Sequence, residues 1–248
     1  ASNALGFLLH DQYVGLTTAA ARDVRHDRLG ATAVGVVERL DAGRWKTRPL
    51  LDALADAASG RHVLAWSRHA PEQRAWAEAG IDGTLTRRSL AVSLLNRSGA
   101  KLDPFVRLEP RLELTRRDDD HLAAVLTVTV ANGTPPGEPR YIAGPHPDTD
   151  LDAGEYGGVL VVDVPGSASG LRARGAGVVA EGSNGPVETL GVLVEVPPGD
   201  ERSVTFTFSL PRDAFPLVVE PMARVPTVTW QAGETAWEAT KRWELALP

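Results

Sequence analysis

Apolar positions recur every three or four residues in the first third of the chain, which is the spacing of one face of an α-helix. Val36, Val37 and Leu40 show this spacing, with Ala33 one turn before them. Each apolar stripe ends at a glycine, the residue that most readily closes a helix. Three helices are therefore predicted: residues 33–40 before Gly43, 50–57 before Gly60, and 75–79 before Gly80. Residues 62–67 form an apolar run with the length of a short strand.

After Arg88 the period of the apolar positions changes from about 3.6 to 2. Residues 122–130 and 204–210 alternate apolar with less apolar side chains, as strands with one buried face do. Clusters of Gly, Pro, Ser and Asn separate such stretches and predict turns. We therefore predict an α+β fold. Residues 5–88 would form a small, mostly helical region with one short strand, packed on a larger antiparallel β-sandwich of the immunoglobulin or fibronectin type over residues 89–248.

The composition excludes several function classes. Hydrophobic residues make up 43% of the 248 residues, as in ordinary globular proteins, and no apolar run approaches the ~20 residues of a membrane-spanning helix. The absence of cysteine excludes disulfides, thiolate metal sites and cysteine nucleophiles. No phosphate-binding loop occurs, and the frame from Gly166 to Gly170 has Ala168 where a hydrolase elbow needs serine.

Charge is spread unevenly along the chain. Residues 1–100 carry a net charge of +3 and residues 101–248 a net charge of −9. An acidic sandwich repels phosphate backbones, so no nucleic-acid partner is expected.

The beginning of the chain indicates a piece of a longer protein. Residues 2–4, Ser-Asn-Ala, resemble the remnant of a cleaved expression tag, so we exclude residues 1–4 from the fold prediction. The sequence from Leu5 has neither a starting Met nor a signal peptide. We therefore expect any membrane anchor to lie upstream of Leu5.

Several short strings occur together in a fixed order. They are Asp11-Gln-Tyr13, residues 62–67, Pro71-Glu-Gln73, Gly80-Ile-Asp-Gly83, Asn96, Lys101-Leu-Asp103, Tyr141-Ile-Ala-Gly144, Val164-Pro-Gly166 and Val196-Pro-Pro-Gly199. In this order the chain resembles the C-terminal region of the bacterial, mainly actinobacterial, family called domain of unknown function 4012. The resemblance runs along most of residues 5–248.

The resemblance implies a cellular setting, and it assigns no catalytic residue. Such proteins are single-pass, extracytoplasmic proteins of the cell envelope, often encoded near polysaccharide genes. The family's most recognisable motif, Asn-Asn-Ala-Glu followed by Gly-Gly, is absent from this chain. An active site formed by that motif would lie upstream of Leu5, and these residues would then only support it.

The densest polar part of the family-like pattern is formed by Asn96, Lys101 and Asp103. In one interpretation they only order a loop: Asn96 bonds to its own backbone, and Lys101 pairs with Asp103. In the other they bind a polymer or a partner at the junction of the two regions, because ligand sites favour clefts between domains.

No metal site is predicted. Asp148, Asp150 and Asp152 alternate in a loop and could converge on Ca²⁺, which prefers oxygen ligands, but a solvated acidic loop is the simpler interpretation. The six histidines are scattered, and no two have the i, i+4 spacing of a helical zinc site.

Three tryptophans, Trp230, Trp237 and Trp243, lie close together near the end of the chain. Exposed indole rings can stack on sugars. Trp230 and Trp243 fit inward strand positions, which favours packing in the core.

These observations lead to one leading hypothesis and two alternatives. The leading one is a non-enzymatic module of an anchored envelope protein that binds a cell-wall glycan or another envelope protein. The first alternative is the supporting half of a cell-wall polymer-processing enzyme whose active site lies upstream of Leu5. The second is an intracellular structural protein, in case the family resemblance is accidental. No cofactor and no catalytic residue is predicted.

Overall fold

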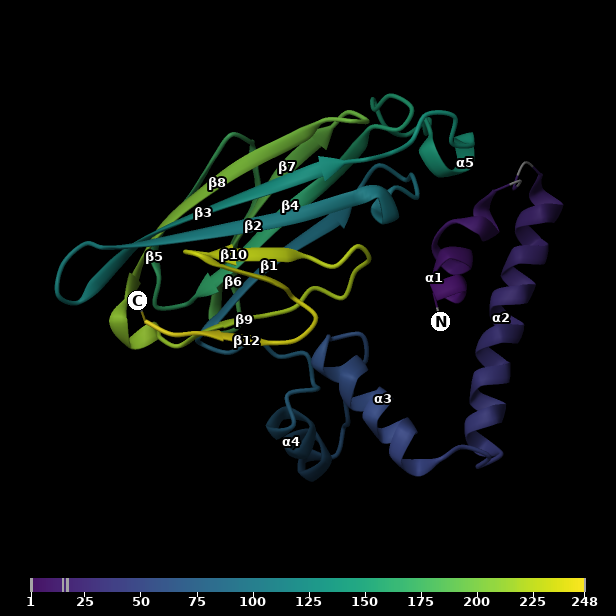
Figure 1. Cartoon of the computed structure of the whole chain (residues 1–248), viewed down its shortest axis with the longest axis horizontal. Helices are drawn as coiled ribbons and strands as arrows, with labels where there is room; N and C mark the ends of the chain where they lie inside the picture. Colours follow the sequence, from purple (N-terminus) through teal and green to yellow (C-terminus); the bar gives the residue numbers. More distant parts are fainter. Residues whose placement is uncertain (1, 15, 17, 248) are drawn as a thin grey trace.

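The structure is a computed structural model that describes residues 2–14, 16 and 18–247. Ala1, excluded from the fold prediction, and Pro248, the last residue of the predicted sandwich, lie outside this part. The described chain starts with helices and continues with strands (Figure 1). The N-terminal elements are α1 (Ser2–Leu9), η1 (Asp11–Tyr13), α2 (Ala19–Asp41), α3 (Thr47–Ser59) and α4 (Ala70–Glu78). The three predicted helices are confirmed as parts of α2, α3 and α4.

The predicted strand at residues 62–67 is wrong. This segment forms no ladder. The His62 and Val63 N–H groups donate to the Ala57 oxygen of α3 at 2.8 and 3.3 Å, and the Ala65 N–H donates to the Ile81 oxygen at 2.8 Å. An apolar run becomes a strand only beside another strand, because its backbone groups need partners. The nearest elements here are helices.

Two sheets of six strands each form the rest of the molecule (Figure 1). Their orders are β12-β9-β1-β4-β7-β6 and β11-β10-β2-β3-β8-β5. The strands are β1 (Ser89–Asn96), β2 (Val106–Arg116), β3 (His121–Asn132), β4 (Tyr156–Pro165), β5 (Ser169–Arg174), β6 (Val178–Asn184), β7 (Val187–Val196), β8 (Glu201–Pro211), β9 (Leu217–Val219), β10 (Thr229–Ala232), β11 (Thr235–Glu238) and β12 (Trp243–Leu245). Short helical turns interrupt them: η2 (Asp103–Phe105), α5 (Arg140–Ala143) and η3 (Arg212–Ala214).

The two sheets are mixed, so the prediction of a purely antiparallel sandwich is wrong in two places. β1 pairs with β9 in parallel, and β2 pairs with β10 in parallel. The other pairs are antiparallel, and the longest, β2–β3 and β3–β8, run in unbroken register. The fold is therefore β-rich α+β, with strands β9 and β10 near the end of the chain added beside its first two strands.

The core lies between the two sheets and follows the predicted alternation. On β3, Leu122, Leu126 and Val130 are buried, and on β8 Val204, Phe206, Phe208 and Leu210 are buried as well. One continuous apolar cluster joins side chains of both sheets. Burying a side chain of this size stabilises a fold by about 1.5–3 kcal/mol, so this face fixes the register of the strands.

The predicted packing of the helical region on the sandwich is not confirmed. α2 lies to one side of the sheets in Figure 1, and its apolar side chains Val36, Val37 and Leu40 are about half exposed. Neither α3 nor α4 has a buried residue. Within the described residues, the helical region meets the sandwich through a few local contacts instead. Tyr13 stacks on Tyr141 with ring centroids 6.0 Å apart, His10 lies edge-on against Phe105, and polar contacts occur at His10 and at Arg61.

Candidate functional site

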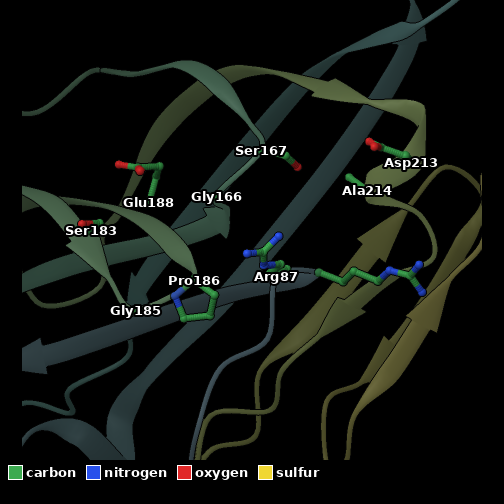
Figure 2. A pocket seen from close by; sticks show the side chains of 10 residues that line it. Arg87, Gly166, Ser167, Ser183, Gly185, Pro186, Glu188, Asp213 and Ala214 are labelled. Atoms are coloured by element: carbon green, nitrogen blue, oxygen red, sulfur yellow. The ribbon is translucent and has the colours of Figure 1, made fainter.

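A polar cavity of about 630 Å³ lies at one end of the sandwich, and we call it the end cavity. Its wall comes from four places: the segment before β1, the β4–β5 turn, the β6–β7 turn and η3. The side chains that define it are Arg87, Arg88, Ser167, Ser183, Glu188 and Asp213. In the view of Figure 2 the Arg87 side chain lies between those of Glu188 and Asp213. The cavity therefore presents guanidinium, carboxylate and hydroxyl groups together.

The charged groups of the end cavity are not used by the fold. Within the part of the chain that the structure describes, Arg87, Arg88, Glu188 and Asp213 make no side-chain hydrogen bond and no ion pair. All four residues are exposed. Their hydrogen-bonding capacity is thus left for water or for a ligand.

The shape of the end cavity is fixed by two turns that touch. The Gly166 N–H donates to the Pro186 oxygen at 3.0 Å, and a Cβ at Gly166 would come within 2.5 Å of the same oxygen. Gly185 beside it has a φ of +63°, a conformation that side chains other than glycine rarely adopt. The sequence therefore holds the β4–β5 and β6–β7 turns together on one side of the cavity.

A second cavity, of about 420 Å³, lies where the helical region meets the sheet of β1, and we call it the junction cavity. Arg61 and Thr84 line it from the helical side, and Ser93, Asp163 and Glu220 line it from the sheet side. Gly185 and Pro186 line this cavity as well as the end cavity. The two cavities are thus neighbours, separated by the β6–β7 turn.

Glu220 is the centre of a buried ionic network at the junction. Its side chain is 1% exposed, and its Oε2 accepts from Arg242 Nε at 2.8 Å and from Arg61 Nη1 at 3.3 Å. The Ser89 hydroxyl donates to its Oε1 at 2.8 Å. The Arg61 Nη2 also donates to the Gly83 oxygen at 2.8 Å. This network ties the segments around Arg61 and Arg242 to the sheet, and both carboxylate oxygens of Glu220 are occupied.

Asp163 is the other buried carboxyl group of the junction cavity. It lies opposite Ala91 on β1 and opposite Thr189 on β7, and the Thr189 hydroxyl donates to its Oδ1. Burial raises the pKa of Asp163, and the Thr189 hydrogen bond opposes that shift only in part. Its Oδ2 has no hydrogen bond from any described residue, so it is free for a ligand.

The two carboxyl groups do not form an acid–base pair. General base catalysis needs a carboxylate that reaches the substrate or a water molecule. Glu220 is enclosed by its arginines and by Ser89, whereas Asp163 faces the cavity. The geometry suits binding rather than proton transfer between two carboxyl groups.

The predicted site residues lie at the far end of β1 from the junction cavity, and the structure brings two of the three together. Asn96 Nδ2 donates to Asp103 Oδ2 at 2.8 Å and to the Ala100 oxygen at 3.0 Å. Asn96 Oδ1 accepts from the Ser98 N–H at 2.9 Å. The Lys101 side chain is exposed and makes no ion pair within the described residues. Asn96 and Asp103 therefore order the loop, and the predicted pairing of Lys101 with Asp103 is wrong.

Asp103 also meets buried groups behind the loop. The Tyr156 hydroxyl donates to its Oδ1 at 3.5 Å, and Arg224 Nη2 donates to its backbone oxygen at 3.2 Å. Burial raises the pKa of Tyr156 and lowers the pKa of Arg224. Both carboxylate oxygens of Asp103 are therefore bonded inside the protein, one to Tyr156 and the other to Asn96.

The acidic loop proposed for calcium lies between α5 and β4. Asp148, Asp150 and Asp152 are exposed there, and the Asp152 N–H donates to Glu155 Oε2 at 3.0 Å. Across residues 2–14, 16 and 18–247, no group of three or more His, Asp or Glu side chains is placed to hold a metal ion. In the same residues, no helix combines the length and the apolar character that crossing a membrane requires.

The three tryptophans form a stack. The ring centroids of Trp230 and Trp237 are 6.2 Å apart, and those of Trp237 and Trp243 are 5.3 Å apart. Trp230 is buried, as predicted, whereas Trp243 is 38% exposed, so its predicted inward position is wrong. β12, which carries Trp243, lies at the sheet edge, where a side chain has neighbours on one side only. Trp237 has a ring on each face and cannot stack on a sugar.

Sequence reasoning missed the residues of both cavities. Asp163 carried a signal, because it interrupts the apolar strand from Val159 to Val164 with a charge. Arg87 and Arg88 are adjacent basic residues at the start of the predicted sandwich. Glu220 gave no signal, since its partners Arg61 and Arg242 are far from it in the sequence.

Comparisons with known proteins assign no family to this chain. No family model and no curated protein matches it. One solved structure with partial likeness is a Legionella pneumophila protein described as a "putative nutrient binding protein", with 8% identity and a TM-score of 0.28. The alignment covers 58% of this chain and 47% of that one, so the chain spans about half of that protein's length. A likeness of this size assigns neither a fold family nor a ligand.

Proposed function

We propose that this chain is a non-enzymatic module that binds a glycan at the end cavity. The observation that carries the proposal is the set of unpaired groups there: Arg87 and Arg88 as donors, Glu188 and Asp213 as acceptors, and two serine hydroxyls, within one cavity of about 630 Å³. Ligand pockets usually have volumes of about 300–1,000 Å³.

The mixture of groups selects the class of ligand. A guanidinium group only donates hydrogen bonds and a carboxylate only accepts them. A simple anion would suit Arg87 and Arg88 but would be repelled by Glu188 and Asp213. A simple cation would suit Glu188 and Asp213 but would be repelled by Arg87 and Arg88. A sugar hydroxyl both donates and accepts, so adjacent hydroxyls on one ring satisfy both kinds of group at once.

The family resemblance supplies the setting of the proposal. It supports a cell-wall polysaccharide as the ligand, an extracytoplasmic location and anchoring through a segment upstream of Leu5. An envelope protein is the alternative partner. We also propose that the sandwich is a module of the immunoglobulin or fibronectin type and that the helical region rests on it through the Glu220 network.

Affinity electrophoresis tests the glycan proposal. The protein is run through native gels containing dextran, yeast mannan, arabinogalactan or xylan. We expect at least one polymer to retard the wild-type protein, and Arg87→Gln to remove most of the retardation, because a bidentate donor is lost.

The matched control is Arg172→Gln, which removes an exposed arginine of β5 outside the cavity. It should migrate as the wild type does in every gel. Equal retardation of the wild type and Arg87→Gln would exclude the end cavity as the site. No retardation of the wild type by any of the four polymers would count against glycan binding itself.

A further inference from the structure

The junction cavity adjoins the end cavity across the β6–β7 turn, and the proposed function does not use it. We infer that it is a second sugar subsite, so that the ligand is a chain of sugars that crosses this turn and not a single sugar. The inference rests on the proposed glycan-binding function. The observations that carry it are the spacing of the two cavities and the free groups of the second one.

The spacing follows from the strands that line both cavities. Arg88, directly before β1, lines the end cavity, and Ala91 of β1 lines the junction cavity. Gly166, directly after β4, lines the end cavity, and Asp163 of β4 lines the junction cavity. Each pair is three positions apart along a chain that is strand except at its turn residue, which corresponds to at most roughly 10 Å at about 3.3 Å per residue. One sugar ring does not reach across that distance, whereas successive rings of one chain do.

The surface of the junction cavity offers groups suited to sugar hydroxyls. Asp163 Oδ2 and the Ser93 hydroxyl have no hydrogen-bond partner among the described residues, and both line the cavity. Ala91 and Asp163 are cross-strand partners, and the small alanine leaves space beside the carboxyl group. One acceptor and one hydroxyl can thus meet a ring that lies on the sheet.

The charge balance favours a neutral sugar in this subsite. Glu220 is compensated by Arg61 and Arg242, whose guanidinium groups already donate to it. The remaining carboxyl group, Asp163, repels a phosphate or a uronate in its ionised form and offers no compensating positive charge in its protonated form. Burial favours its neutral form, which can itself donate to a sugar oxygen. The subsite therefore fits an uncharged hexose or pentose unit.

A chain-length series tests the inference. Oligosaccharides of increasing length, from the single sugar to about six units, are prepared from whichever of the four polymers retards the wild type. Their affinities are measured by isothermal titration calorimetry with the wild type, Ser93→Tyr and Arg87→Gln. Ser93→Tyr fills the junction cavity and leaves the end cavity intact. Thr207→Tyr, on β8 of the other sheet, is the matched control, and circular dichroism confirms that each variant is folded.

We expect the wild type to bind the longer oligosaccharides about tenfold or more tightly than the single sugar, a gain of about 1.4 kcal/mol. Ser93→Tyr should lose this gain and keep the affinity for the single sugar. Arg87→Gln should lower the affinity for the single sugar and for the longer oligosaccharides alike. Affinity that does not grow with length, or Ser93→Tyr that keeps the full gain, would overturn the second subsite and leave glycan binding standing. If no polymer retards the wild type, both proposals fail together.

Discussion

Two buried carboxyl groups at the junction show how strongly the surroundings of one residue decide its state. Glu220 has two guanidinium partners and a hydroxyl donor, so its burial is compensated. Asp163 has one hydroxyl donor, and Arg61 acts on it only as a nearby charge. A buried charge without a close partner of opposite sign is costly. The pKa of Asp163 is therefore raised by burial.

This shift predicts how the stability of the protein depends on pH. Because the folded pKa of Asp163 lies above its value in the unfolded chain, the folded state holds a proton that the unfolded chain has lost between the two pKa values. The contribution of this proton to the free energy of unfolding is fully present below the unfolded pKa, about 4. It is lost as the pH rises through the folded pKa. Asp163→Asn cannot ionise, so its free energy of unfolding should exceed that of the wild type at about pH 7 and match it more closely at about pH 3.

Urea unfolding of the wild type and Asp163→Asn at both pH values measures this difference. Asp213→Asn, at an exposed carboxylate of the end cavity, is the control and should shift stability little at either pH. A difference between Asp163→Asn and the wild type that is the same at both pH values would show that ionisation of Asp163 does not affect folding.

Among the elements, the short strands at the end of the chain carry two tryptophans for which the sequence predicts the same inward position, but which differ in burial. Trp230 of β10 is 1% exposed and Trp243 of β12 is 38% exposed, although both belong to one stack. Removing a fully buried tryptophan costs about 3–5 kcal/mol, because the lost contacts leave a cavity. We expect Trp230→Ala to lower the free energy of unfolding by that amount and Trp243→Ala by less than about 1.5 kcal/mol.

Urea unfolding followed by circular dichroism measures both tryptophan variants without relying on indole fluorescence, which the substitutions change. Trp45→Ala is a suitable reference, since that ring is 42% exposed and lies outside the sandwich. If Trp243→Ala costs as much as Trp230→Ala, the outer ring of the stack contributes to the core as fully as the inner one.

Periodicity predicted most elements and none of the pairings between them. The alternation in residues 122–130 and 204–210 located β3 and β8, because a buried face imposes a period of two. The parallel pairs β1–β9 and β2–β10 could not be predicted, since alternation does not say which strand lies alongside. The strand predicted at residues 62–67 is wrong for the same reason, because an apolar run does not show whether another strand lies beside it. The residues of the end cavity lie on turns and at strand ends, where no period exists. Ser93 and Asp163 of the junction cavity lie within β1 and β4, but alternation does not show which polar strand residues border a cavity.

For the molecule as a whole, the contrast is between a sandwich with a buried core and helices whose described side chains are mostly exposed. Strands β3 and β8 are paired on both sides and buried on one face. The side chains of α2 that the structure describes are partly or fully exposed along the helix. A helix without tertiary packing is marginally stable in water, so the two parts should differ in local stability.

Hydrogen exchange followed by mass spectrometry measures this difference. We expect amides of α2 to exchange at least about a hundredfold faster than those of β3, because opening α2 exposes little buried surface. Amides of β8 serve as an internal control and should be as protected as those of β3. Equal protection of α2 and β3 would mean that the apolar face of α2 is covered in solution, for example by a second copy of the chain.

The parallel pairs also affect how the protein is made. The ribosome delivers β1 and β2 long before β9 and β10, which lie beside them in the finished sheets. Until residues 217–245 have emerged, both early strands present an unpaired backbone edge, and such edges join readily to other chains. The nascent sandwich is therefore most prone to aggregate late in translation, when a chaperone that shields strand edges would raise the yield most.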